Sequence, residues 1–453
     1  MAVASHLLLY HVLGAASFVA LLYFSVWQVD LRHLSLASVL PGGLLFSFPS
    51  AARAPLPFVE RRGARLSLAG RPFYANGWNS YWLMDQAVEP GTRHRVSRML
   101  RSGADMGLTV CRTWAFNDGA YNALQLAPGR FDERVFRALD LVVAEAGRHG
   151  VRLVLSLANN LEHYGGKTQY VRWAWEEGVG LSSSNDSFFS DPAIRDYFKV
   201  YLKTLLTREN HLTGVQYRDD PTIMAWELMN EPRCASDPSG DTLQRWIEEM
   251  AAYVKSIDKK HLLTIGSEGF YGPSSPRSKV NVNPGFWHEN YGADFIRNAN
   301  ISDIDFASIH IYPDKWLPHG KLEEKLKYVT RWITSHAADG EKELDKPVLT
   351  TEFGVSNSVK GFDHSHRDAV YKAVYDTVYE SASRGGAAAG AFVWQLAVEG
   401  MEEYLDDFAV VPSERPSLRR MLRAQSCRLA KLRRGEGEEA KRTRSVCAAA
   451  DLP

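Results

Sequence analysis

Short β-rich runs alternate with longer amphipathic segments through most of the chain, and this alternation constrains the fold more than any other feature. The longer segments carry apolar residues at three-to-four spacing, which is typical of helices with one buried face. Clear examples span residues 132–150, 191–210 and 241–257. The short runs lie at residues 73–79, 108–114, 151–157, 222–228, 261–267, 305–312, 347–353 and 391–396. Eight strands, each followed by a crossover, predict an α/β fold of the (β/α)₈ TIM-barrel type, as a single domain over residues 66–430.

A doubly wound open sheet is the alternative arrangement for alternating strands and helices. Such sheets commonly bind nucleotides through a glycine-rich turn after an early strand. The sequence has no GxGxxG after an early run and no GxxxxGK followed by Ser or Thr. The open sheet therefore lacks its best support, and the barrel is favoured.

The N-terminus carries a long uncharged apolar stretch. Residues 7–29 contain no Asp, Glu, Lys or Arg. The stretch exceeds the apolar core of a typical signal peptide and is long enough to span a bilayer. Residues 1–29 are therefore predicted to be a signal peptide or a signal anchor. Secretion is expected, with a membrane-anchored form in the secretory pathway as the alternative, and Asn185 and Asn300 are candidate glycosylation sites in Asn-x-Ser triplets.

Two segments flank the predicted barrel without a core-forming pattern. Residues 30–65 contain scattered Pro, Gly and Ser and are interpreted as a stem or linker. Residues 431–453 are rich in charge and are predicted to be a disordered tail. The only membrane contact expected is through residues 7–29.

Charge and cysteine content narrow the function classes. The chain has 53 basic and 53 acidic residues, so no overall electrostatic attraction to nucleic acid is expected. The four cysteines, Cys111, Cys234, Cys427 and Cys447, allow three full pairings, and the sequence does not choose among them. Cys111 lies in an apolar run and is most simply a buried free thiol. No Cys or His spacing suggests a metal site.

Polar and aromatic residues collect at the ends of the predicted strands. In a (β/α)₈ barrel these carboxyl ends meet on one rim, where function is located. A barrel without chemistry would have no reason to gather such residue types there. The residues at these ends are Arg112, Trp114, Asn230, Glu231, His310, Tyr312, Glu352 and Trp394.

Glu231 and Glu352 follow the fourth and seventh runs, so a closed barrel would let them face each other across its mouth. Two opposed carboxyl groups are what glycoside hydrolysis needs, one as a neutral acid and one as an attacking anion. Glu352, beside Arg112 and Tyr312, is expected to stay ionised, while burial and the neighbouring charge raise the pKa of Glu231.

The remaining rim residues have expected roles around this pair. His310 would orient a carboxyl group or shuttle a proton, and Asn230 would donate to the sugar 2-hydroxyl. Trp114 and Trp394 offer flat apolar faces for pyranose rings. Singly, each residue also has a structural interpretation, such as a strand-to-helix turn, a salt bridge or a buried histidine, but jointly they favour a carbohydrate-cleaving site.

Several motifs resemble glycoside hydrolase family 5, and within it the plant endo-β-mannanases. These are "NGWNSYW", "CRTWAFNDG", "YRDDPTIMAWELMNEPRC", "SIHIYPDKW" and "LTTEFGVS". The resemblance runs from about residue 60 to about residue 430. It implies Glu231 as acid/base and Glu352 as nucleophile. It also implies a cleaving subsite lined by Arg112, Trp114, Asn230, His310, Tyr312 and Trp394.

The activity that this resemblance implies is retaining endo-hydrolysis of β-1,4-mannosidic linkages in mannan, glucomannan or galactomannan of the cell wall. No metal or organic cofactor is expected, the partner is the polysaccharide itself, and a monomer is expected. The residues alone do not separate manno from gluco substrates, so a cellulase or xyloglucanase is an alternative. Transfer of mannan chains to another sugar and a non-catalytic wall-glycan-binding role are further alternatives.

A long insertion follows the third run at residues 159–190. Long loops at the working face of a barrel are usually functional. Its aromatic residues Tyr164, Tyr170, Trp173 and Trp175 have two equally supported interpretations. They would either contact outlying sugar units or anchor the insertion to the barrel.

Overall fold

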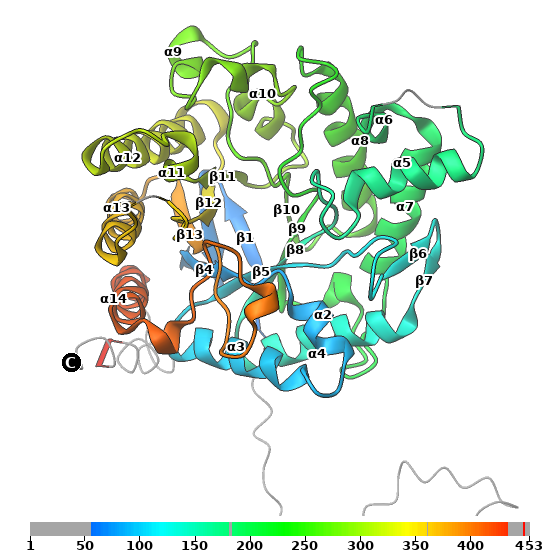
Figure 1. Cartoon of the computed structure of the whole chain (residues 1–453), viewed down its shortest axis with the longest axis horizontal. Helices are drawn as coiled ribbons and strands as arrows, with labels where there is room; N and C mark the ends of the chain where they lie inside the picture. The colour runs from blue at the N-terminus through cyan, green and yellow to red at the C-terminus, as the bar shows by residue number, and fades with distance from the viewer. Residues whose placement is uncertain (1–55, 181–183, 360, 434–446, 449–453) are drawn as a thin grey trace, which may run out of the picture. The chain divides into compact units, whose positions relative to one another are not determined.

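Eight parallel strands follow one another around a barrel in the computed structural model, which describes residues 56–180, 184–359, 361–433 and 447–448 (Figure 1). The strands are β4 (Ala75–Asn79), β5 (Val110–Trp114), β8 (Arg152–Ser156), β9 (Ile223–Glu227), β10 (Leu262–Thr264), β11 (Ala307–Ile311), β12 (Val348–Phe353) and β13 (Ala388–Val393). Each strand lies beside its neighbour in the sequence, and β13 pairs with β4, which joins the last strand to the first.

The junction between β10 and β11 is bridged by hydrogen bonds that each join a residue of one strand to a residue flanking the other. The backbone N–H of Asp305 donates to the Leu263 carbonyl at 2.8 Å, and that of His310 donates to the Glu268 carbonyl at 3.0 Å. The Ser267 hydroxyl also donates to the Ser308 carbonyl. These bonds bring together the two strands at the ends of the ladder, so the predicted (β/α)₈ fold is confirmed.

Helices surround the barrel and connect successive strands (Figure 1). The long ones are α3 (Arg93–Asp105), α4 (Glu133–His149), α7 (Pro192–Leu206), α8 (Asp241–Ile257), α12 (Leu322–Asp339), α13 (His364–Ser383) and α14 (Pro416–Leu432). Short helices are α2 (Leu83–Val88), α5 (Gly166–Glu176), α6 (Ser187–Ser190), α9 (Arg277–Val280), α10 (Phe295–Ala299) and α11 (Pro313–Trp316). The helix predicted over residues 191–210 begins where Asp191 caps it, accepting from the backbone N–H of Ala193 at 2.9 Å.

A three-stranded antiparallel sheet packs at the amino-terminal end of the barrel. It consists of β1 (Val59–Arg62), β2 (Arg65–Leu68) and β3 (Arg71–Phe73). Apolar residues of this sheet form one buried cluster with residues from the starts of the barrel strands, including Val110, Met224 and Phe306. Strand β1 lies inside the segment 30–65 that the sequence interprets as a stem, so this part of the segment belongs to the barrel core.

The last barrel strand begins three residues before the apolar run that predicts it. The run at 391–396 is rich in large side chains, whereas β13 begins with Ala388, Ala389 and Gly390. A β-carbon at Gly390 would lie 1.9 Å from the Ala75 carbonyl oxygen, so β4 and β13 approach too closely for a side chain there. Because these three residues lack large apolar side chains, the sequence pattern does not predict the start of this strand.

The chain ends carry several predictions that fall outside the described residues. These include the signal peptide or anchor at 1–29 and most of the tail at 431–453. One disulfide links Cys427, on α14, to Cys447, while Cys111 and Cys234 are buried free thiols. None of the helices in the described ranges combines the length and hydropathy that a membrane crossing requires.

Candidate active site

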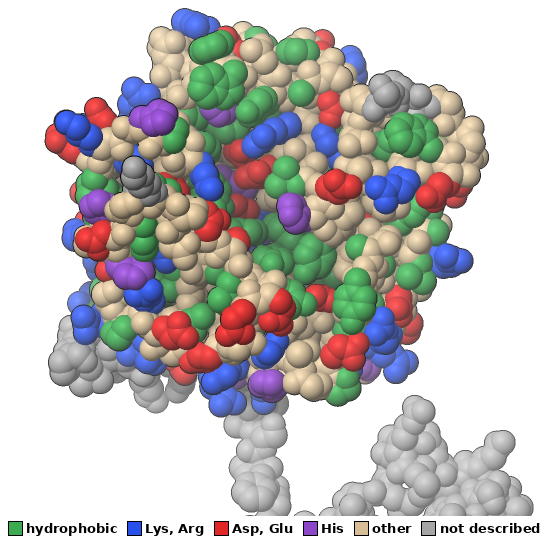
Figure 2. Space-filling model, in the orientation of Figure 1, with side chains coloured by type: hydrophobic (Ala, Val, Ile, Leu, Met, Phe, Trp, Pro, Cys, Tyr) green, Lys and Arg blue, Asp and Glu red, His purple; other side chains and the backbone are tan. Residues whose placement is uncertain are grey.

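A cleft of about 500 Å³ opens at the carboxyl ends of the barrel strands. It is the hollow at the centre of the face in Figure 2, with hydrophobic and acidic side chains around it. Six of the eight rim residues predicted from the sequence line it: Trp114, Asn230, Glu231, Tyr312, Glu352 and Trp394. The other two, Arg112 and His310, are fully buried beneath it, where Arg112 donates to Glu352 and Asn230 and His310 contacts Glu231.

Glu231 is held in the cleft by an uncommon backbone conformation. Its φ angle is 51°, in the left-handed region that non-glycine residues rarely adopt. Its backbone N–H donates to the Gly266 carbonyl at 2.9 Å. A β-carbon at Gly266 would lie 2.1 Å from the Met229 carbonyl oxygen, so only glycine allows this close approach. Strained backbone of this kind is often found where a side chain must be aimed at a reaction centre.

Glu352 lies in β12 and faces Glu231. One carboxylate oxygen of each glutamate lies within 4.8 Å of the other. The Glu352 side chain accepts from Nη1 of Arg112 at 2.5 Å on one oxygen and from the Tyr312 hydroxyl on the other. Both oxygens of Glu352 therefore have donors that favour a negative charge.

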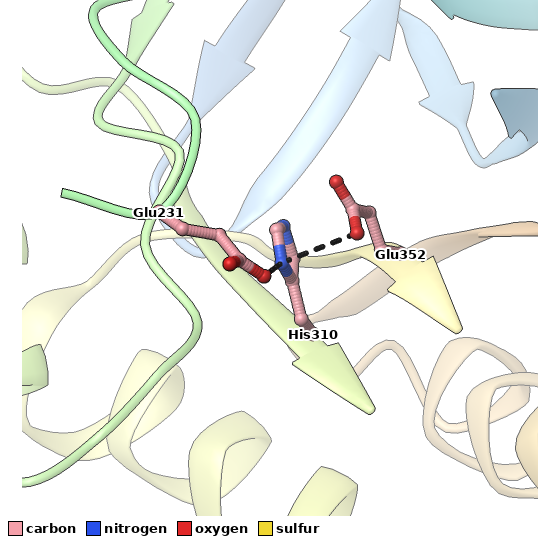
Figure 3. A group of neighbouring side chains, drawn as sticks. All are labelled: Glu231, His310 and Glu352. Carbon is pink, nitrogen blue, oxygen red and sulfur yellow. Dashed lines mark hydrogen bonds and ion pairs between the residues drawn. The ribbon is translucent and has the colours of Figure 1, made fainter. Parts of the chain in front are cut away.

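His310 lies between the two glutamates (Figure 3). Its Nδ1 is 2.8 Å from Oε1 of Glu231 and 3.5 Å from Oε2 of Glu352. Its Nε2 is buried and has no hydrogen-bond partner among the described residues. Burial lowers the pKa of His310 below its ordinary value, although the Glu352 charge opposes this. A neutral imidazole with its proton on Nδ1 satisfies this geometry, since only Nδ1 faces an acceptor.

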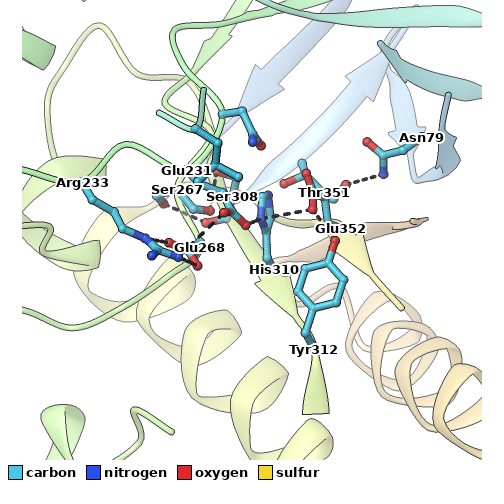
Figure 4. Close-up of polar contacts among 12 residues, drawn as sticks. Asn79, Glu231, Arg233, Ser267, Glu268, Ser308, His310, Tyr312, Thr351 and Glu352 are labelled. Carbon is cyan, nitrogen blue, oxygen red and sulfur yellow. Dashed lines mark hydrogen bonds and ion pairs between the residues drawn. The ribbon is translucent and has the colours of Figure 1, made fainter. Parts of the chain in front are cut away.

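Arg112 organises the floor of the site. It is fully buried, and its guanidinium donates to Glu227, Glu352, Asn79 and Asn230. The Asn79 amide in turn donates to the Thr351 carbonyl at 2.9 Å, which fixes its oxygen toward Arg112 (Figure 4).

A second ion pair lies beside Glu231. Arg233 donates to both oxygens of Glu268, at 2.7 and 2.6 Å, and its Nη2 is 3.8 Å from Oε2 of Glu231 (Figure 4). Burial raises the pKa of Glu268 to about 7, and the charge of Glu231 adds to this effect. Neither Arg233 nor Glu268 is among the rim residues predicted from the sequence.

The pKa values of the two facing glutamates differ from the sequence expectation in one respect. Burial raises the pKa of Glu231 above its ordinary value, as expected, while Arg233 and Arg112 oppose the shift. Burial also raises the pKa of Glu352, although His310 and Arg112 lower it. The expectation that Arg112 and Tyr312 hold Glu352 ionised considers its neighbours only, and the structure adds the opposing cost of removing this carboxylate from water.

Aromatic side chains form the walls of the cleft. Trp394 stacks on Tyr81 with a centroid distance of 5.9 Å, and its indole N–H donates to Asp406 at 2.8 Å. The ring centroids of Trp114 and Trp394 are 5.8 Å apart, and the Arg112 guanidinium lies over the Trp114 ring. Flat apolar faces held by hydrogen bonds suit the binding of pyranose rings.

Of the four aromatic residues singled out in the insertion at 159–190, one lines the cleft. Tyr164 lines it and contacts Tyr81 edge to face. Tyr170 and Trp173 are buried and pack against each other, which anchors the insertion. Trp175 is 48% exposed and is not among the cleft residues.

The described residues contain one close group that could offer three metal ligands, and it consists of Glu231, His310 and Glu352. The same atoms already exchange hydrogen bonds with each other and with Arg112 and Tyr312. A cation bound by the two carboxyl groups would compete with the hydrogen bonds that Arg112, Tyr312 and His310 donate to them.

One buried residue of the site, Glu227, has a signal in the sequence. Its carboxylate lies in β9 as the only charged group of the strand "IMAWE". A charge inside an apolar run requires a buried partner, and here that partner is Arg112. Asn79, Tyr81, Glu268 and Asp406 carry no comparable signal, because their roles depend on which strand ends and loops meet at the rim.

Comparisons with known proteins agree with this geometry. Residues 56–408 match the model of the family described as GH family 5 beta-mannosidase-like. The chain is 70% identical over 449 residues to mannan endo-1,4-beta-mannosidase 2 of Oryza sativa subsp. japonica, covering 99% of this chain and all of that protein. It is 63% identical to mannan endo-1,4-beta-mannosidase 2 of Arabidopsis thaliana, over 83% of this chain and 87% of that one.

Solved structures are similar as well. An endo-1,4-beta-D-mannanase from Thermotoga petrophila is 32% identical, with a TM-score of 0.67 over 78% of this chain and 99% of that one. An endo-1,4-beta-mannanase from Rhizomucor miehei is 30% identical, with a TM-score of 0.69 over 83% of this chain and 99% of that one.

Proposed function

Because this chain belongs to the family of glycoside hydrolase family 5 beta-mannosidase-like proteins, we propose that it hydrolyses internal β-1,4-mannosidic linkages of mannan-type polysaccharides with retention of configuration. The relatives named as mannan endo-1,4-beta-mannosidases support the choice of substrate. The open cleft suits cutting inside a chain, because a polymer can lie across it.

The observation that carries the proposal is the separation of the two glutamates. One carboxylate oxygen of Glu231 and one of Glu352 lie within 4.8 Å of each other. Retaining glycosidases place their carboxyl groups about 5–5.5 Å apart, whereas inverting ones need about 6.5–9.5 Å to admit a water. The short separation supports a double displacement.

In the first step, Glu352 attacks C1 of the mannose unit on the non-reducing side of the bond that breaks. The bond between C1 and the glycosidic oxygen breaks as the ester between C1 and Glu352 forms, and Glu231 gives its proton to the departing oxygen. Glu231 suits this role because burial raises its pKa, which favours the protonated form that a general acid needs. Glu352 suits attack because Arg112 and Tyr312 donate to both of its oxygens.

In the second step, Glu231 is an anion and takes a proton from a water that attacks C1 from the vacated side. The ester bond breaks, Glu352 leaves as a carboxylate, and Glu231 again holds its proton. The Nδ1–H of His310 would stabilise the Glu231 anion between the two steps. Asn230, whose amide donates to Asn159 at 3.1 Å, is held where it can meet the sugar 2-hydroxyl.

We further propose that the protein is secreted to the cell wall. The apolar run at 7–29 supports entry into the secretory pathway. The disulfide between Cys427 and Cys447 fits an oxidising compartment. Both candidate glycosylation residues, Asn185 and Asn300, are exposed. Mobility of a tagged full-length chain before and after deglycosylation tests this, and an unglycosylated cytosolic product would contradict it.

Release of reducing ends from mannan, glucomannan, cellulose and xyloglucan, measured in parallel, tests the substrate. The proposal expects release from mannan and glucomannan together with a rapid fall in the viscosity of the solution, which reports internal cuts. Release from cellulose or xyloglucan alone would contradict it.

A further inference from the structure

Glu227 and Glu352 share the guanidinium of one buried arginine. Arg112 uses its Nε–Nη2 edge for Glu227, with distances of 2.9 Å from Nε and 2.6 Å from Nη2. Glu352 receives a single N–H from Nη1 at 2.5 Å. The remaining N–H groups go to Asn79 at 3.0 Å and Asn230 at 2.8 Å, so the five donors of Arg112 are all engaged.

The paired edge of Arg112 thus serves Glu227, and the nucleophile candidate Glu352 receives a single bond. A guanidinium fork matches a single carboxylate with two parallel hydrogen bonds, and that arrangement is the strongest one. If Glu352 took the fork, its lone pairs would be held by Arg112 and its basicity would fall. A carboxylate that attacks carbon needs the opposite, an anion that remains basic and has a free lone pair.

The surroundings of Glu227 are built to hold its carboxylate in place. The Ser156 hydroxyl on β8 donates to its Oε1. A β-carbon at Gly266 would lie 2.8 Å from Cδ of Glu227, so the glycine that admits the Glu231 backbone also makes room for Glu227. Both Glu227 and Arg112 have no exposed surface. One carboxylate would be enough to balance the buried charge of Arg112, so the presence of two calls for a further explanation.

We propose that Glu227 is a positioning residue that holds the paired edge of Arg112 and thereby limits Arg112 to one hydrogen bond with Glu352. Glu227 is not among the residues that line the cleft, and it acts through Arg112. The role rests on the proposed function, in which Glu352 is the nucleophile. Its consequence is a Glu352 carboxylate that receives one hydrogen bond from Arg112 and keeps a free lone pair for attack.

The test is Glu227→Gln, which keeps the shape of the side chain and removes its charge. The amide of this variant has one oxygen for the two N–H donors on the Nε–Nη2 edge of Arg112. One of these donors would lose its acceptor, so the guanidinium should shift toward the Glu352 carboxylate. We expect the pKa of Glu352 to fall by about one unit and kcat to fall about tenfold or more. Titration of the Glu352 carboxyl by carbon-13 NMR measures the first effect, with the signal assigned by its loss in Glu352→Gln.

Asp140→Asn provides a matched control. Asp140 is also fully buried and takes the fork of an arginine, Arg208, at 2.8 and 2.6 Å. It lies on α4 and is not among the cleft residues. This variant should lower the melting temperature and leave the Glu352 titration unchanged, because it removes a buried ion pair far from the nucleophile.

An unchanged or raised pKa of Glu352 in Glu227→Gln would overturn the proposal. If that variant does not fold, Ser156→Ala tests the same idea in the opposite direction. Without the Ser156 hydroxyl, Glu227 should bind Arg112 more strongly, which leaves Arg112 less able to stabilise the Glu352 anion. The pKa of Glu352 should therefore rise. An unchanged or lowered value would overturn the proposal. The NMR titration needs no substrate, so failure of the wild-type protein to cut mannan would count against the proposed function and leave this measurement standing.

Discussion

The Nδ1 atom of His310 lies 2.8 Å from Oε1 of Glu231. Glu231 follows the last residue of β9 by four positions and has a left-handed backbone conformation. This contact links the carboxyl group that we propose as the acid/base to a buried imidazole whose pKa is lowered by burial. The pair is thus a neutral donor beside a carboxyl group that must lose and regain a proton.

The first prediction concerns this donor. His310→Ala should lower kcat about ten- to hundredfold, because Glu231 loses both its orientation and the hydrogen bond that favours its anion. Removing that bond raises the pKa of Glu231, so the alkaline limb of the kcat/KM profile should move to higher pH. His336→Gln is the control, since His336 is buried and bonded to two backbone carbonyls. If the alkaline limb also moves in His336→Gln, or does not move in His310→Ala, then His310 is not the donor that stabilises the Glu231 anion.

The second prediction separates the roles of the glutamates. Glu352→Ala and Glu231→Ala should each reduce turnover of mannan by several orders of magnitude. On an aryl mannoside with a good leaving group, azide should restore activity to both. Azide replaces the nucleophile in Glu352→Ala and should give the α-mannosyl azide. Azide replaces the attacking water in Glu231→Ala and should give the β-mannosyl azide. The opposite pattern of products would mean that Glu231 is the nucleophile and Glu352 the acid/base.

A third prediction uses Tyr312, whose hydroxyl donates to Glu352. Tyr312→Phe removes a donor that favours the Glu352 anion, so the pKa of Glu352 should rise further above its ordinary value. The reaction needs that anion, so the acidic limb of kcat/KM should move to higher pH. Arg112→Met is a poorer test, because it leaves Glu227 and Glu352 buried without their shared cation and should destabilise the fold.

The fourth prediction distinguishes cleft aromatics from outlying ones. Trp394→Ala should weaken activity on mannan at least tenfold, because it removes a stacking face that Asp406 and Tyr81 hold in place. Trp175→Ala should change activity less than twofold, since this exposed residue is not among those lining the cleft. Equal losses in the two variants would mean that the insertion extends the binding surface beyond the cleft.

The barrel and most of its rim could be predicted from the sequence because strand periodicity and strand ends are local properties. Glu231 and Glu352 follow or end apolar runs, and a closed barrel brings such ends together. The start of β13 could not be predicted, because Ala388, Ala389 and Gly390 have no large side chains.

The partners of the rim residues could not be predicted in the same way. Asn79 comes from the first barrel strand and Glu268 from a loop after the fifth, and each meets its partner only once the barrel closes. The pKa of Glu352 also depends on burial as well as on charge, and the sequence gives the neighbouring charges without the depth of the site.

The most direct test of the central claim is the anomeric configuration of the first product released from a mannan oligosaccharide, followed by proton NMR before mutarotation. Two glutamates with oxygens within 4.8 Å of each other predict a double displacement. The first product should therefore be the β-anomer, which converts only later to the equilibrium mixture. Initial release of the α-anomer would contradict the account.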